Sequence, residues 1–359
     1  MKKLFVLLTV SFLLGMTGSS IAQISLSGDL QVRARDDIKD NGDYGNYSDD
    51  LYYMMRAGLN VNATLGDGFF GKMRLEHYNY AGYIYTAGSG LDGSSYAPTI
   101  PGSNDIIARP TVNFTQLFLG VHRDNWGVEA GIFPISGLAN PIFDIHYMPG
   151  VMVDIPFTLY RLGTLVGVSG YVAAGPGKIN AFISNDFNGN YVEDAEGNDL
   201  NNPHDAYTIG ANYDFKVQDF GIQPIAMVRV ASDSVAAPLS YGINLSSPDF
   251  SGFKVGFDAA LSNQTVDGTA KYDAQLFRIL ASLDPGFGSI EAWFDIAKRT
   301  DKDVYDEVTN TTMDVDHNYT YLWLLYKIPV FKSDHGSLTM IPRVRRITEK
   351  IDNAKDYTR

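Results

Sequence analysis

Residues 24–35 read ISLSGDLQVRAR, and their side chains alternate between two kinds of surface. In an extended chain one face would carry Ile, Leu, Gly, Leu, Val and Ala, whereas every residue on the other face is polar. Residues 253–262, FKVGFDAALS, repeat this alternation with few exceptions. Because successive side chains of a β-strand point to opposite sides, the period of two predicts amphipathic strands. Their length, about 9 to 11 residues, suits strands that cross a membrane.

The same pattern recurs along most of the chain, and no long helical period competes with it. It is clear in residues 55–65, 207–217, 239–245 and 289–299, and weaker in stretches that begin at Phe69, Asn113, Trp126, Asp273, Asn318 and Ser337. Short connections rich in Gly, Pro, Asp and Asn predict tight turns at 66–68, 123–125, 175–177, 218–219, 247–249, 284–286 and 333–336. Longer polar segments, predicted to be loops, lie at 36–50, 87–109, 185–205, 262–271 and 300–317.

Short turns that alternate with long loops are typical of an antiparallel, up-and-down transmembrane β-barrel. Counting the predicted strands along the sequence gives about fifteen and the start of another at Tyr357. The sequence therefore predicts an all-β barrel of about 16 strands. Residues 134–161 contain several prolines and are predicted to be mainly a loop, entering a strand at residues 162–173. The chain stops at Arg359, where the closing strand should begin, so we expect a truncation of about one strand or a different closure.

The N-terminus has the pattern of a secretory signal peptide. Two lysines follow Met1, an apolar run covers residues 4–16, and Ser20-Ile21-Ala22 forms a small-x-small cleavage site. We therefore expect residues 1–22 to be removed and residues 23–359 to form the barrel. No other segment approaches the roughly 20 consecutive apolar residues that a membrane-spanning helix needs, so a crossing would have to use strands.

Composition narrows the function classes. The chain has 41 acidic and 28 basic residues, and removal of Lys2 and Lys3 would leave 26 basic residues, which makes nucleic acid an unsuitable partner. The absence of Cys excludes disulfides, a thiolate nucleophile and Cys-ligated metal. The six His residues show no metal-binding spacing, so we predict no metal site and no cofactor.

Taken together, the export signal, the alternating strands, the short Asp/Gly/Pro turns and the long Asp/Asn/Gly loops resemble those of Gram-negative outer-membrane porins. The resemblance covers nearly the whole mature chain and is architectural, because no short motif marks one porin family. It implies a non-enzymatic, water-filled channel in the bacterial outer membrane, through which small hydrophilic solutes and ions diffuse. The implied partners are outer-membrane lipid and those solutes; homotrimers are common among such proteins, although no interface is identifiable in the sequence.

The resemblance also implies an extracellular loop that folds into the channel, and residues 134–161 are the best match. Acidic residues of this loop would face basic residues on the barrel strands, which would set a transverse field across a constriction. In the simpler alternative, the charges are the ordinary, balanced lining of a solvated interior. The predicted pore-lining residues are Arg33, Arg35, Arg56, Lys72, Arg74, Glu129, Asp144, Asp154, Arg343 and Arg345.

Two other classes of protein stay open at this point. Outer-membrane enzymes of the lipase or protease type share the barrel architecture, and Asp144 with His146 offers a loose acid and base set. An exported soluble β-sandwich that binds a partner would also have alternating strands. Uncharged outward faces such as that of residues 322–328 favour the barrel, but a sandwich could bury them.

Overall fold

The computed structural model describes residues 23–35, 38–40, 46–48, 52–81, 112–134, 164–187, 192–193, 199–200, 206–231, 237–266, 269–306 and 310–352. Within these residues the chain is all-β and its strand pairs are antiparallel. It divides into two units, residues 1–122 and 123–359. The strands of the main sheet number 16 in the described residues, four in the first unit and twelve in the second.

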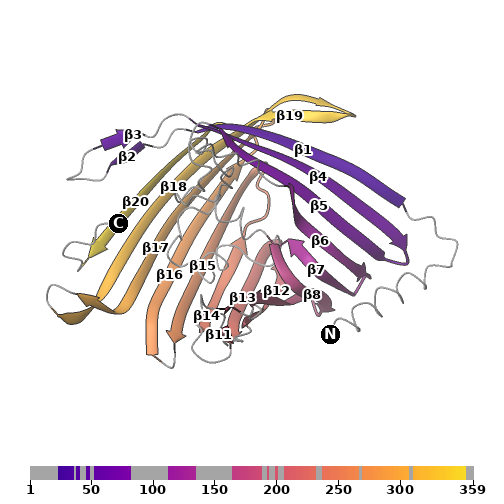
Figure 1. Cartoon of the computed structure of the whole chain (residues 1–359). Helices are drawn as coiled ribbons and strands as arrows, with labels where there is room; N and C mark the ends of the chain where they lie inside the picture. Colours follow the sequence, from indigo (N-terminus) through magenta and orange to yellow (C-terminus); the bar gives the residue numbers. More distant parts are fainter. Residues whose placement is uncertain are drawn as a thin grey trace, which may run out of the picture. The chain divides into compact units, whose positions relative to one another are not determined.

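In the first unit, four strands pair in chain order (Figure 1). They are β1 (Gln23–Arg35), β4 (Tyr52–Gly66), β5 (Phe69–Ala81) and β6 (Val112–His122). A separate two-stranded ribbon, β2 (Ile38–Asp40) with β3 (Asn46–Ser48), lies between β1 and β4 in sequence. The turn after β4 uses Gly66, Asp67 and Gly68, all with positive φ, as expected for a tight hairpin.

The second unit continues the same up-and-down order with longer strands towards its end (Figure 1). Its sheet strands are β7 (Trp126–Pro134), β8 (Thr164–Ala174), β9 (Gly177–Phe187), β12 (Ala206–Val217), β13 (Phe220–Ala231), β14 (Ala237–Ser246), β15 (Phe253–Val266), β16 (Thr269–Leu283), β17 (Ser289–Asp306), β18 (Thr311–Ser333), β19 (Gly336–Met340) and β20 (Arg343–Asp352). A small ribbon of β10 (Val192–Glu193) and β11 (Asp199–Leu200) stands apart.

The two faces of each sheet differ as the alternation predicts. We call the face that carries exposed large apolar side chains the outer face, and the opposite one the inner face. Many large apolar side chains of the outer face are exposed, for example Leu30 at 77%, Ile183 at 51% and Leu322 at 49%. Apolar exposure repeated on strand after strand is far more than a water-soluble domain tolerates, so the outer face suits contact with lipid.

Two predicted loops turn out to be largely strand. Residues 262–271 and 300–317 extend β15, β16, β17 and β18 well beyond the apolar part of the sheet. The prediction was wrong because it required an apolar face, whereas a hydrogen-bonded ladder needs only paired backbones. Here charged side chains pair across the strands instead, as Lys298 does with Asp316.

The last strand, predicted to begin at Ser337, is interrupted. β19 pairs with residues 328–333 of β18, and β20 pairs with residues 316–325 of the same strand. The break falls at Ile341 and Pro342, and the carbonyl of Pro342 still accepts a hydrogen bond from the backbone N–H of Tyr326. A proline cannot donate to a ladder, so it fits at such a break. The predicted signal peptide and most of residues 134–161 lie outside the described residues.

Candidate functional site

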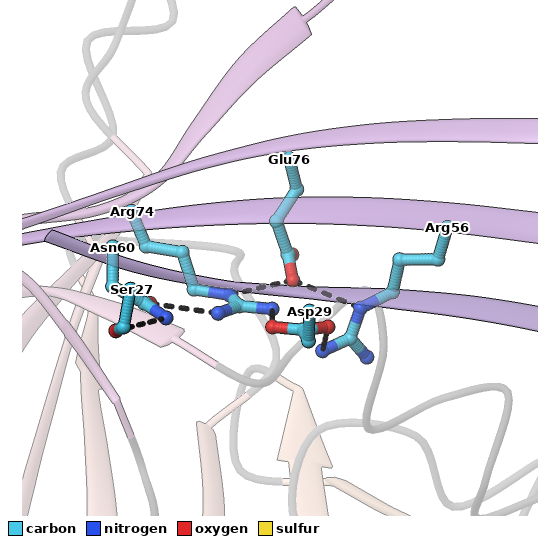
Figure 2. A network of polar contacts seen from close by, with 6 residues as sticks. All are labelled: Ser27, Asp29, Arg56, Asn60, Arg74 and Glu76. Carbon is cyan, nitrogen blue, oxygen red and sulfur yellow. Dashed lines mark hydrogen bonds and ion pairs between the residues drawn. The ribbon is translucent and has the colours of Figure 1, made fainter. Parts of the chain in front are cut away.

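Three strands of the first unit bring a group of polar side chains together on the inner face, shown in Figure 2. The register of the strands sets this arrangement, because Asn60 lies opposite Ser27 on β1 and opposite Arg74 on β5. Residues two apart on a strand share a face, which brings the next pair of polar positions into the same group. We call this group the Arg74 cluster: Ser27, Asp29, Arg56, Asn60, Arg74 and Glu76.

Arg74 is the centre of the cluster and uses three of its nitrogens. Its Nε donates to Glu76 Oε1, its Nη1 to Asn60 Oδ1 and its Nη2 to Asp29 Oδ1, each at 2.7 Å. The side chain therefore reaches from β5 across β4 to β1, as Figure 2 shows. Hydrogen bonds between charged groups are stronger than neutral ones, and the planar guanidinium fixes their directions.

Arg56 completes the cluster from the other side. Its Nε lies 3.1 Å from Glu76 Oε1, and its Nη2 lies 3.4 Å from Asp29 Oδ2. Both carboxylates are thus shared by both arginines, and the four charges sum to zero. The burial is unequal, because the side chains of Arg74 and Glu76 are 11% and 7% exposed, whereas those of Arg56 and Asp29 are 26% and 43% exposed.

Gly58 makes the crossing of Arg74 sterically feasible. This residue lies on β4 between Asp29 on β1 and Glu76 on β5. A Cβ atom at this position would stand 2.3 Å from Nη2 of Arg74 and 3.0 Å from Oδ1 of Asp29. Any side chain at position 58 would therefore occupy the place of the guanidinium group, so the cluster depends on a glycine there.

The cluster can act on charged solutes without any chemistry of its own. Its net charge is zero, so its field at long range is weak. At short range, however, the half-exposed carboxylate of Asp29 and the guanidinium of Arg56 present opposite charges side by side to the space beyond the inner face. Fixed charges of this kind tune ion passage when they line a narrow path.

The other predicted residues of the first unit lie close to the cluster in the sheet. Arg33 is on β1, two residues beyond Gln31, which pairs with Arg56. Lys72 precedes Arg74 on the same face of β5 and is exposed, with its Nζ 5.8 Å from the ring centres of both Phe70 and Phe118. Only the backbone of Arg35 is described.

In the second unit the predicted residues lie on different strands. Glu129 is half-buried on β7, opposite Ser169. Arg343 and Arg345 are half-buried on β20, and the guanidinium of Arg343 lies 5.7 Å from the ring centre of Trp323. The positions of Asp144 and Asp154 lie outside the described residues, so the predicted opposition between loop acids and strand bases stays a prediction.

A second charged group on the inner face was not predicted as a site. It consists of Asp258 on β15, Arg278 on β16 and Asp295 on β17, which are cross-strand neighbours, and we call it the Arg278 cluster. The Nε and Nη2 atoms of Arg278 donate to the two carboxylate oxygens of Asp295 at 2.8 Å each. Asn244 donates to Asp258. The three residues are only 0%, 1% and 2% exposed.

Neither cluster resembles a metal centre. Within the described ranges, no group of three or more His, Asp or Glu residues could hold a metal ion. In the same part of the chain, no helix is long and apolar enough to span a membrane.

Comparison with known proteins places the fold. No protein-family model matches the sequence, and no curated protein matches it. Among solved structures, a loop-deletion mutant of OmpT, an outer-membrane protein of Vibrio cholerae, matches 91% of this chain and 99% of its own, with a TM-score of 0.52 and 9% identity. The trimer form of OmpT matches 92% and 100%, with a TM-score of 0.50 and 9% identity. An anion-selective porin from Comamonas acidovorans matches 92% and 98%, with a TM-score of 0.48 and 11% identity.

The two OmpT matches extend over nearly the full length of both chains, and the 16 described strands have the same up-and-down order that the sequence predicted. The predicted fold class, an all-β antiparallel barrel of the outer-membrane type, is therefore confirmed. The exposed apolar outer face agrees with the same conclusion. The chain has the β-barrel fold of bacterial outer-membrane proteins.

Proposed function

We propose that this protein is a porin that forms a water-filled channel for passive diffusion of small hydrophilic solutes and ions. The observation that carries the proposal is the contrast between the two faces of the first unit. Its outer face exposes Leu26, Leu30 and Val32 to lipid, whereas its inner face carries charged and amide groups that remain accessible in part. A barrel of about 16 strands is wide enough to leave such an inner face in contact with water.

The Arg74 cluster supplies the fixed charge of this channel lining. Arg33, Arg56 and Arg74 hold positive charge on the inner face, and Asp29 and Glu76 balance part of it. Removal of the arginines would leave the carboxylates without cationic partners and would make the lining attractive to cations. The other predicted pore-lining residues, including those of the 134–161 loop, belong to the same proposal.

Planar-bilayer recording of the full chain tests the function directly. We expect stepwise ohmic conductance in the unmodified protein. We expect the variant Arg33→Gln/Arg56→Gln/Arg74→Gln to shift the reversal potential under a salt gradient towards cations. The control removes positive charges from the outer face instead, with Arg346→Gln and Lys350→Gln, and should leave the reversal potential unchanged.

One outcome would overturn the channel, and another would overturn the part assigned to the Arg74 cluster. Absence of conductance from folded protein would exclude a channel, and esterase or protease activity in its place would favour the outer-membrane enzyme. Equal reversal potentials for the arginine variant and the control would remove the Arg74 cluster from the channel lining. We further propose a homotrimer, the form recorded for one OmpT structure, which mass measurement in detergent would test.

A further inference from the structure

The second unit has a cavity on its outer face, at the level where the apolar surface ends. Its volume is about 310 Å³, and its lining comes from four adjacent strands, β14 to β17. The register places seven of the nine lining residues in two rows on the same face of the sheet, and the buried pair Ser262 and Ala274 lies in the row between them. One row contains Tyr241, Leu261, Gln275 and Lys298, and the next contains Asn263, Asp273 and Thr300.

The rows on the turn side of this cavity are apolar. Phe277 and Ile296 lie opposite each other in the row next to the cavity, and Ile279 and Phe294 in the row after that. All four are exposed, at 41%, 52%, 50% and 39%. The cavity is therefore continuous with the lipid-facing surface and lies where acyl chains give way to headgroups.

The charges around the cavity decide which headgroup fits. Lys298 Nζ is 2.7 Å from Asp316 Oδ2, and Lys302 Nζ is 3.1 Å from Asp314 Oδ2 and 3.7 Å from Asp273 Oδ2. The two amines thus already have carboxylate partners, and the three carboxylates outnumber them. A phosphate would have to displace these carboxylates from both amines, which disfavours an anionic headgroup.

The remaining lining suits hydroxyl groups. Asn263 is exposed and Gln275 is half-buried, and among the described residues neither side-chain amide has a hydrogen-bond partner. An amide can both donate and accept, and the half-free carboxylate of Asp273 accepts, so together they match sugar hydroxyls, which also do both. Tyr241, 49% exposed, adds an aromatic ring beside them.

We propose that this cavity binds the sugar headgroup of a glycolipid, whose acyl chains lie along the apolar rows of β15, β16 and β17. The cavity is on the side of the sheet opposite to the short turns, and in outer-membrane barrels that side faces out of the cell. The ligand would therefore come from the outer leaflet. This site is separate from the channel, so it holds whether or not the protein conducts.

Native mass spectrometry of the full chain in non-ionic detergent tests the proposal. The probes are monoglucosyl diacylglycerol, phosphatidylethanolamine and phosphatidylglycerol with identical acyl chains. We expect the glucosyl lipid to be retained most strongly, and the variant Asn263→Leu/Gln275→Leu to lower its retention about tenfold through loss of the amide hydrogen bonds. The matched control is Thr320→Leu, a polar-to-apolar change on the same face in the row below.

Equal retention of the three lipids would overturn the proposal, and preferential retention of phosphatidylglycerol would replace it with an anion site. Unchanged glucosyl-lipid retention in the double variant would show that the lipid binds elsewhere. If the double variant does not fold, Gln275→Leu alone provides the same comparison with a smaller expected loss, about threefold. Conductance of each variant, measured in parallel, keeps this result separate from the channel proposal.

Discussion

The Arg74 and Arg278 clusters are built from the same kinds of group, yet they are set in opposite surroundings. Arg74 shares two carboxylates with Arg56, and part of that network is exposed, up to 43% at Asp29. Arg278 holds Asp295 in a fork of two hydrogen bonds, and the whole group is nearly inaccessible. Exposed charges interact with passing ions but stabilise little, whereas buried charges contribute to stability only as complete pairs. The Arg74 cluster is therefore accessible from one end, whereas the Arg278 cluster is closed off from solvent.

The largest effect is expected from the buried cluster. Arg278→Leu would leave the carboxylates of Asp295 and Asp258 buried without their cation, and we expect a loss of about 3–5 kcal/mol in the free energy of unfolding. The double variant Arg278→Leu/Asp295→Leu should recover most of the lost unfolding free energy, because it also removes one of the buried carboxylates that Arg278→Leu leaves uncompensated. Denaturant unfolding in detergent micelles measures both. A loss below about 1 kcal/mol for the single variant would mean that water reaches this cluster after all.

The next effect concerns the glycine beneath Arg74. Gly58→Ala would place a methyl group against the guanidinium and force it away from Asp29, at an expected cost of about 1–3 kcal/mol in the free energy of unfolding. The control is Gly71→Ala on β5, where the nearest atom to the added carbon is 4.0 Å away. Similar unfolding energies for the two variants would show that Arg74 moves aside without cost.

A smaller change in stability is expected from the exposed end of the Arg74 cluster. Arg56→Gln leaves both carboxylates paired with Arg74, so the unfolding free energy should fall by only about 0.2–1 kcal/mol. Its reversal potential should nevertheless move towards cations, because one accessible positive charge is lost. If Arg56→Gln lowered the stability strongly and left the reversal potential unchanged, the Arg74 cluster would be a structural group like the Arg278 cluster.

The smallest expected effect is on the pH dependence of stability, and it comes from a residue outside the strands, in the turn after β14. The backbone N–H of Gly252 donates to Asp249 Oδ1 at 2.6 Å, and this bond, together with Lys254, holds the pKa of Asp249 below its ordinary value. Stability from this bond is therefore present above the ordinary Asp pKa and is lost as pH falls through the lower value. The difference in denaturation midpoint between the native chain and Asp249→Asn should shrink from about pH 6 to about pH 2. Lys254→Met should keep most of this pH dependence; if it abolishes the dependence, the ion pair and not the turn is the cause.

Most of the strands could be predicted from sequence, because a strand with one polar and one apolar face alternates polar and apolar residues with a period of two. The Arg74 cluster was predicted only in part. Arg56 and Arg74 stood out as bases on a polar face, but the alternation gave no register between strands, so their bonds to Asp29 and Glu76 were not predicted. The role of Gly58 depends on that register as well.

Other features had weaker signals. Asp258 fell on the polar face of its predicted strand, yet nothing in a single strand shows whether a charged residue is buried. The polar ends of β17 and β18 lacked an apolar face and were predicted to be a loop. Cross-strand pairs such as Lys302 with Asp314 stabilise these ends, and such pairs are visible only when the hairpin register is known.

The length of β18 has a practical consequence. It contains 23 residues, whereas about 9 to 11 suffice to cross a bilayer, and residues 328–333 continue past the point where β17 begins. Its two ends, near Asn310 and Asp334, should therefore emerge in different aqueous compartments. Because the chain contains no Cys, a single cysteine placed at either exposed position would be the only thiol in the protein. One strand thus offers two reporter sites, and labelling intact cells with a membrane-impermeant maleimide would read the orientation of the whole protein.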